Sequence, residues 1–140
     1  MAEKAFEIVV PARVSEANAL VAAVAAAARA RGLDAEGARR LELAVEEMAV
    51  NICHHAQAGA PGEIQVRVWD DEESVTAEIS HEGPAFDPRS VPPPDTTTSL
   101  EERRPGGLGV FLTRQVLEEM HYERQGERNL LRMVVRKSVG

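Results

Sequence analysis

The chain has a single cysteine, no excess of basic charge and no long apolar run, and each shortage excludes a class of protein. With Cys53 alone among 140 residues, no internal disulfide can form, which fits a reducing compartment. The 16 basic residues against 23 acidic ones give a net charge of −7. A nucleic-acid footprint needs a basic face, so we expect no direct contact to nucleic acid. The lone cysteine makes a cytoplasmic protein the expectation. A nucleotide is not excluded, because a few local donors can bind its phosphates.

The sequence also has little that could cross or enter a membrane. Met1–Val10 includes three charged residues and lacks the apolar core of a signal peptide. Ala19–Ala28 is apolar but short, and Arg29 and Arg31 follow it, whereas a membrane span needs about 20 apolar residues. We expect no membrane association. The length and the absence of internal repeats predict one domain over residues 1–140.

Apolar spacing predicts five strands and three helices. Ser15 is expected to be the N-cap of the first helix and Gly32 its end, and Asp34 is expected to cap the second helix. In chain order, the expected elements are a strand at 5–10, a helix at 16–31, a helix from the Asp34 cap to about 58, strands at 64–69 and 75–79, a helix at about 108–120, and strands at 121–124 and 129–136. Strands joined mostly as hairpins predict an α+β two-layer sandwich. Its antiparallel-rich mixed sheet would carry about three helices on one face.

Residues 84–105 fit no regular element. They include six of the eight prolines and are longer than a usual loop, a pattern typical of lids, binding loops or disordered segments. The glycine-rich turn at Gly106–Gly109 follows and leads into the apolar helix. Glycine allows close approach of a ligand, and the start of a helix presents free N–H groups that suit an anion such as phosphate.

The second helix combines an apolar face with a polar row at its border. Glu47 and Asn51 are four residues apart, so their side chains meet along one row, while Glu46 points toward solvent. An acid and an amide oxygen in this position could hold Mg²⁺, and the acid could take a proton from a hydroxyl. The alternative is two polar residues at the edge of a surface helix. The apolar face itself is Leu41, Ala44, Val45, Met48, Ile52 and Ala56.

The segment Ile79–Pro88 leaves the third strand and opens the long loop. Gly83 allows a tight exit and the close approach of a ligand. A polar side chain at the end of the strand could hydrogen-bond the edge of a heterocycle, with Ala85 and Phe86 adding apolar contact. The alternative is an ordinary strand end followed by a glycine and proline turn.

Taken together, these three segments resemble the N, G1 and G2 boxes of the Bergerat-fold (GHKL) ATPase superfamily. Within it, the chain most resembles the anti-sigma-factor serine/threonine kinases, because Glu47, Asn51 and His55 follow one another at intervals of four residues. The Gly-Pro-x-Phe-Asp-Pro string from Gly83 and the Gly-Gly-Leu-Gly run from Gly106 belong to the same group. The resemblance covers nearly the whole chain, about residues 6–136, with the three boxes in order.

The resemblance implies a role for each matching residue. Glu47 would be the general base, Asn51 the ligand of Mg²⁺ and His55 a neighbour of that site, while Gly83 would abut the adenine of ATP. Residues 88–105 would form the lid over the nucleotide, with Arg103 or Arg104 reaching the terminal phosphate. The remaining positions that match contacts to ATP are His81, Ala85, Arg104, Gly107, Leu108, Gly109 and Val110.

His81 is the main departure from this family, which carries an aspartate there to accept the exocyclic amine of adenine. A neutral histidine has one acceptor nitrogen and a protonated one has none. Losing the acceptor would cost about 1–3 kcal/mol, or about one to two decades of affinity. Glu82 should point to the opposite face of the strand, so it cannot substitute. Ala85 stands where a glycine or another small residue is usual, which is a milder change.

Three hypotheses follow. The first is a homodimeric kinase that uses ATP and Mg²⁺ to phosphorylate a STAS-domain antagonist and also sequesters a sigma factor. The second is a scaffold that binds these partners but lacks catalysis, with His81 marking a degenerate nucleotide site. The third is a detached ATP-binding domain that works with a histidine kinase in trans, although no dimerising helix pair with a phosphoacceptor histidine is visible.

Overall fold

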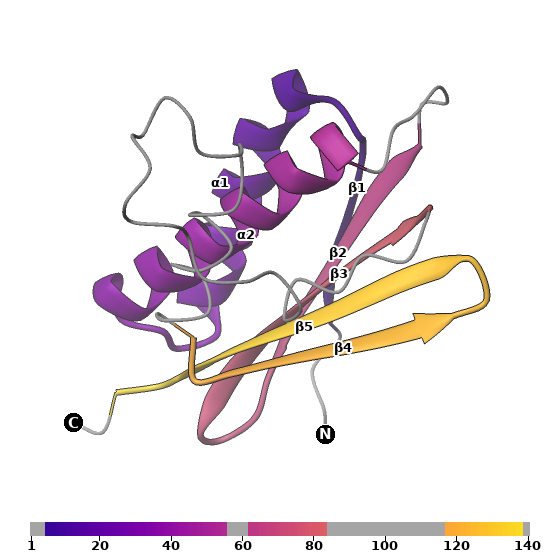
Figure 1. Cartoon of the computed structure of the whole chain (residues 1–140). Helices are drawn as coiled ribbons and strands as arrows, with labels where there is room; N and C mark the ends of the chain where they lie inside the picture. The colour runs from indigo at the N-terminus through magenta and orange to yellow at the C-terminus, as the bar shows by residue number, and fades with distance from the viewer. Residues whose placement is uncertain (1–4, 56–61, 84–116, 139–140) are drawn as a thin grey trace, which may run out of the picture.

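The computed structural model describes residues 5–55, 62–83 and 117–138, and within them two helices cover one face of a five-stranded sheet (Figure 1). The elements in chain order are β1 (Phe6–Pro11), α1 (Val14–Ala30), α2 (Ala35–His55), β2 (Glu63–Asp70), β3 (Ser74–Glu82), β4 (Glu119–Gln125) and β5 (Arg128–Arg136). No helix in these ranges is long and apolar enough to cross a membrane.

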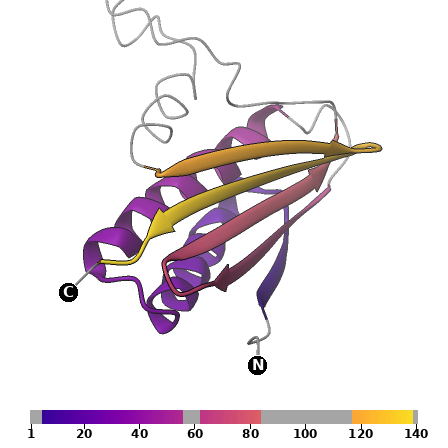
Figure 2. The same ribbon diagram turned by 90° about the horizontal axis from the view of Figure 1, so that it is seen from below.

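The sheet has the strand order β1-β2-β3-β5-β4, and each of its four neighbouring pairs is antiparallel. The α+β class is therefore confirmed, but the described sheet is antiparallel throughout instead of mixed. Both helices lie on the same face, with α1 over β1 and β2 and α2 over β3 and β5 (Figure 2). This arrangement brings Met48 and Ile52 of α2 together with Ile79 and His81 near the end of β3.

The core lies between this helical layer and the sheet. The predicted apolar face of α2 is buried from Leu41 to Ile52, and Ala56 lies outside the described residues. Strand residues that alternate with polar neighbours pack against it, because successive side chains of a strand point to opposite faces. They include Val66, Val68, Val75, Ala77, Ile79, Met133 and Val135.

The expected boundaries hold at some elements and fail at others. The carboxylate of Asp34 accepts a hydrogen bond from the backbone N–H of Gly37 at 2.8 Å, which confirms the cap of α2. Gly32 follows the end of α1 with φ of 106°, a conformation that favours glycine. Ser15 is not the N-cap of α1, since the helix starts at Val14 and the extended Arg13 precedes it without a side-chain cap.

The expected helix at 108–120 is wrong at its C-terminal end. Glu119 and Met120 begin β4, where they pair with Val134 and Met133 of β5, and Met120 packs against the core. Pairing with β5 therefore overrides the helical spacing of these residues. The rest of that prediction lies outside the described residues, which include two helices and not about three.

Candidate functional site

Glu47 and Asn51 lie one turn apart on α2, at the border between the core and solvent. Asn51 is 2% exposed, and its side-chain amide donates a hydrogen bond to the carbonyl oxygen of Glu47 at 2.8 Å. Hard cations bind oxygen ligands, so Oδ1 is the atom of Asn51 that such a cation would bind. The hydrogen bond of the amide nitrogen holds the side chain in place. Glu47 is half-buried and Glu46 exposed, as the helical spacing predicted.

The partial burial of Glu47 changes its acidity. Burial raises the pKa of this carboxyl above its ordinary value, and the neighbouring charge of Glu46 adds to the shift. A carboxylate with a raised pKa is a stronger base than an ordinary surface glutamate. Proton transfer from a hydroxyl is most efficient when the pKa of the base lies near the working pH, so the environment of Glu47 favours that role.

His81 lies inside β3 and not beyond its end, because the strand continues to Glu82. It pairs with Asn129 of β5, and its side chain faces α2 with only 5% exposure. Its Nδ1 is buried without a hydrogen-bond partner in the described part of the chain. Burial lowers the pKa of His81. A hydrogen bond with the backbone of Glu82 opposes this shift, and the charges of Arg128 and Arg124 add to it, so the imidazole is neutral near pH 7.

A small pocket connects His81 with α2. It is about 10 Å³ in volume, enough for about one water molecule. Two of its lining residues, Met48 and Ile52, follow Glu47 and Asn51 directly in sequence, so the polar row and His81 belong to one region. The described residues that line it are Met48, Ile52, Ile79, His81, Tyr122, Asn129 and Leu131.

Tyr122 and Asn129 are members of this pocket that the sequence analysis missed. The hydroxyl of Tyr122 donates a hydrogen bond to Oδ1 of Asn129, which is 2% exposed. A signal for Asn129 was present, because it shares the alternation of Leu131, Met133 and Val135, whose side chains face the core. A polar residue in a buried register indicates either a satisfied core group or a site.

Gly83 directly follows the end of β3 in a conformation with φ of 151°, which suits glycine. Its backbone is tied to the β4–β5 hairpin, because its N–H donates to the carbonyl oxygen of Glu127 at 3.0 Å and its carbonyl accepts from Arg124. At the far end of β5, the N–H of Glu118 donates to the carbonyl oxygen of Val134 at 3.0 Å. The segment between Gly83 and Glu118 is thus attached to the sheet on both sides.

The phosphate side of the expected site stays a prediction. The side chain of His55 and the whole of residues 84–116 lie outside the described part of the structure. That range includes the expected lid at 88–105 and the predicted contacts Ala85, Arg103, Arg104, Gly107, Leu108, Gly109 and Val110.

The described residues include no group of three or more His, Cys, Asp or Glu side chains that could hold a metal ion. Mg²⁺ usually keeps several waters and takes one or two protein oxygens together with phosphate oxygens. Oδ1 of Asn51, with the carboxylate of Glu47 one turn away, fits this limited requirement.

Comparison with known proteins identifies the family and two relatives of the chain. A family model described as a histidine kinase-like ATPase domain matches residues 10–135. The serine/threonine-protein kinase BtrW of Bordetella bronchiseptica is 31% identical over 86 residues, which is 61% of this chain and 61% of that protein. The serine-protein kinase RsbW of Listeria monocytogenes is 31% identical over 94 residues, or 64% of this chain and 60% of that protein. The chain therefore spans about 60% of the length of these curated relatives.

Proposed function

The chain belongs to the histidine kinase-like ATPase domain family, and on this premise we propose that it is an ATP-dependent serine/threonine protein kinase of the anti-sigma-factor type. The observation that carries the proposal is that Glu47 and Asn51 share one row of α2, while the residues that follow them, Met48 and Ile52, line the pocket that contains His81. One relative is named a serine/threonine-protein kinase and the other a serine-protein kinase. Both names support phosphate transfer to a protein hydroxyl as the reaction class.

Glu47 is the general base in this proposal. Its carboxylate takes the proton from a serine or threonine hydroxyl as that oxygen forms a bond to the terminal phosphorus of ATP. The bond from that phosphorus to the bridging oxygen breaks, and ADP leaves with the electron pair. Asn51 would hold Mg²⁺ through Oδ1, and the ion would neutralise charge on the phosphates. Burial raises the pKa of Glu47, which suits it to accept the proton.

The other roles come from the resemblance and are part of the same proposal. Gly83 and His81 approach the base, and residues 88–105 form a lid over the nucleotide within a single domain. Either Arg103 or Arg104 reaches the terminal phosphate. The remaining contacts proposed around ATP are His55, Ala85, Gly107, Leu108, Gly109 and Val110.

We further propose a cytoplasmic homodimer that phosphorylates a STAS-domain antagonist and sequesters a sigma factor. The acidic net charge of −7 fits a protein that controls transcription through protein partners and not by binding DNA itself. These partners are the ones that the family resemblance implies.

The test is a set of variants measured for nucleotide binding and for phosphate transfer separately. Glu47→Ala should keep the rise in melting temperature on adding ATP with Mg²⁺, while transfer to a STAS-domain protein from the same genome falls by about 10²–10⁴-fold. The exposed neighbour gives a matched control, since Glu46→Gln should change transfer by less than about threefold. Undiminished transfer by Glu47→Ala would contradict the assigned base.

The second candidate is a partner-binding scaffold without catalysis. Two observations favour it: His81 occupies the position of the family's carboxylate, and the pocket beside it has the volume of about one water. In that case neither ATP nor ADP would raise the melting temperature, yet the chain would still bind a sigma factor or a STAS-domain protein. The nucleotide titration therefore separates the two candidates before any kinase substrate is known.

A further inference from the structure

His81 is buried, and in the described part of the chain one of its two ring nitrogens has no hydrogen-bond partner. Among the described residues, its Nδ1 is the only buried side-chain nitrogen or oxygen that lacks a hydrogen-bond partner. Such atoms are rare because they lose their hydration without compensation. The pocket beside Nδ1 has room for about one water, so a water or a polar group of a bound ligand can supply the missing partner.

The surroundings of His81 define what that ligand can be. Met48, Ile52, Ile79 and Leu131 give the pocket apolar walls, which suit the flat faces of a heterocycle. Tyr122 and Asn129 complete the described lining, so no carboxylate is among these residues. Glu82, next to His81 in sequence, lies on the opposite face with a side chain that is 76% exposed. The hydrogen-bonding character of the pocket at this point therefore depends on a neutral imidazole.

We infer that His81 makes the nucleotide site tolerant of both 6-aminopurines and 6-oxopurines, an inference that rests on the proposed ATP-binding function. A neutral imidazole exists as two tautomers, so Nδ1 can accept a hydrogen bond in one and donate in the other. It can accept from the amine of adenine or donate to the carbonyl of hypoxanthine. A carboxylate can only accept, and its charge repels a carbonyl oxygen at that place.

A purine reaches Nδ1 only when the lining side chains move, since the pocket has room for about one water. Met48 is suited to such movement because methionine is unbranched and has three rotatable side-chain bonds. Met48 and the Tyr122–Asn129 pair lie on different elements, α2 on one side and the β4–β5 hairpin on the other. Separation of these two sides would open the pocket.

The decisive experiment compares ATP with inosine triphosphate, which differs only in carrying a 6-oxo group and a proton on N1. Dissociation constants are measured by calorimetry with Mg²⁺ for the full chain and for His81→Asp. We expect the parent to bind the two nucleotides within about tenfold of each other. His81→Asp should shift the ratio toward ATP by at least about tenfold, because a carboxylate leaves the oxo group without a donor.

Glu82→Gln is the matched control, since it alters the adjacent residue on the other face and should leave the ratio unchanged. A parent that rejects inosine triphosphate by more than about a hundredfold overturns the inference and leaves the kinase proposal standing. If His81→Asp leaves the ratio of the two dissociation constants unchanged, the inference is also overturned and the kinase proposal still stands. If neither nucleotide binds the parent, both the inference and the proposed function fail.

A spectroscopic test does not depend on the folding of His81→Asp. In protein labelled with ¹⁵N-histidine, His81→Asn identifies the signals of His81 among those of the four histidines. With ATP bound, Nδ1 should have the chemical shift of an unprotonated nitrogen, and with inosine triphosphate that of a protonated one. The same tautomer in both complexes would overturn the inference.

Discussion

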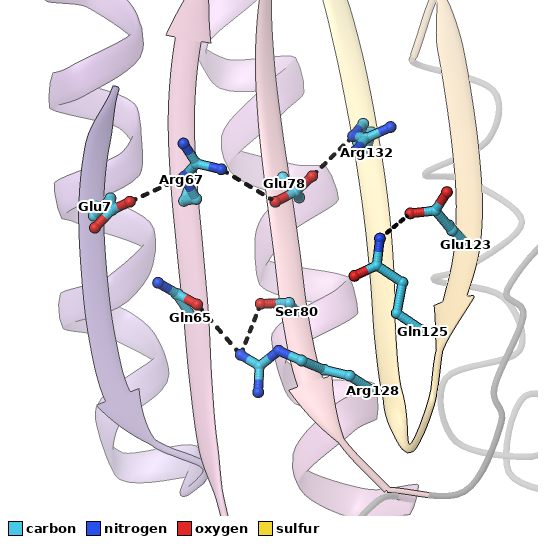
Figure 3. Close-up of polar contacts among 9 residues, drawn as sticks. All are labelled: Glu7, Gln65, Arg67, Glu78, Ser80, Glu123, Gln125, Arg128 and Arg132. Atoms are coloured by element: carbon cyan, nitrogen blue, oxygen red, sulfur yellow. Dashed lines mark hydrogen bonds and ion pairs between the residues drawn. The ribbon is translucent and has the colours of Figure 1, made fainter. Parts of the chain in front are cut away.

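Two buried polar residues of β3, Glu78 and His81, have opposite environments although they are three residues apart. Glu78 is 6% exposed and His81 is 5% exposed. On the face of the sheet away from the helices, Glu78 has Arg132 at 2.8 Å and Arg67 at 3.9 Å (Figure 3). On the helical face, Nδ1 of His81 has no partner among the described residues.

The network around Glu78 extends across four strands. Arg67 also pairs with Glu7 of β1 at 3.0 Å, so the charges alternate from β1 through β2 and β3 to β5 (Figure 3). Beside it, Arg128 donates to Ser80 at 3.0 Å and to Gln65 at 3.3 Å. A buried charge whose neighbours satisfy it serves the fold, whereas a buried atom left unsatisfied indicates a site. This contrast leads to four predictions.

The largest expected effect is at Glu78. Glu78→Ala removes the acid between two arginines and should lower the free energy of unfolding by about 2 kcal/mol, measured by urea denaturation. That is less than the loss usual for a buried pair, because Arg67 and Arg132 are 44% and 43% exposed and can turn to water. Glu7→Gln, at the exposed end of the network, should cost less than about 0.5 kcal/mol. If Glu78→Ala and Glu7→Gln lowered the free energy of unfolding equally, the buried acid would contribute no more than the exposed one.

The second effect is a dependence of stability on pH that comes from His81. Its pKa in the folded state is lowered by burial, so between that pKa and about 6.5 the unfolded chain binds more protons. Stability should therefore fall as the pH decreases below about 6.5, by no more than about 1.4 kcal/mol per pH unit for one proton. Urea denaturation from pH 7.5 to 5 measures this slope, which His81→Leu should reduce.

Glu47 requires a control in that experiment. Burial raises the pKa of its carboxyl, so the folded state holds its proton longer, and this contribution to stability is lost as the pH rises through the folded pKa. Glu47 therefore makes stability fall as the pH rises, whereas His81 makes stability rise with pH. Comparing Glu47→Gln with Glu47→Gln/His81→Leu removes it from both proteins, and an identical slope in the two would exclude His81 as the source.

A third, smaller effect is expected at Tyr122. Tyr122→Phe removes the hydroxyl that donates to the buried amide oxygen of Asn129, and the loss should be about 1 kcal/mol. The double variant Tyr122→Phe/Asn129→Leu should recover part of it, because both polar groups are then absent. Additive losses in a thermodynamic cycle of the two would show that the hydrogen bond contributes little.

The smallest change in stability should come from His81→Leu. Replacing an unpaired buried polar group with an apolar one should leave the free energy of unfolding within about 1 kcal/mol of the parent, or raise it. The rise in melting temperature caused by ATP should decrease in the same protein. If His81→Leu were as destabilising as Glu78→Ala, His81 would be a structural residue like Glu78.

Most of the fold could be predicted from local patterns. Alternation gave the five strands to within a few residues, and the helical spacing of Leu41, Val45 and Met48 placed the buried face of α2. The cap at Asp34 was also predictable, because a side-chain acceptor just before a helix satisfies a free N–H group. These features depend on neighbours in sequence.

Two of the three failures depend on partners distant in sequence, and the third, at Ser15, is local. Met120 fits a helical pattern locally, but pairing with Met133 makes it part of a strand. Ser15 has the chemistry of a cap, yet the backbone is already helical from Val14. The place of Tyr122 and Asn129 beside His81 follows from the register of β5 between β3 and β4, which no single segment specifies.

The two attachments of the segment between Gly83 and Glu118 have a practical consequence. One is formed by the backbone of Gly83 with Glu127, the other by the N–H of Glu118 with Val134, so both involve main-chain groups at opposite ends of β5. Main-chain hydrogen bonds do not depend on which side chains lie between them. We therefore expect the sheet to keep its register when the length or composition of the segment between these two points is changed.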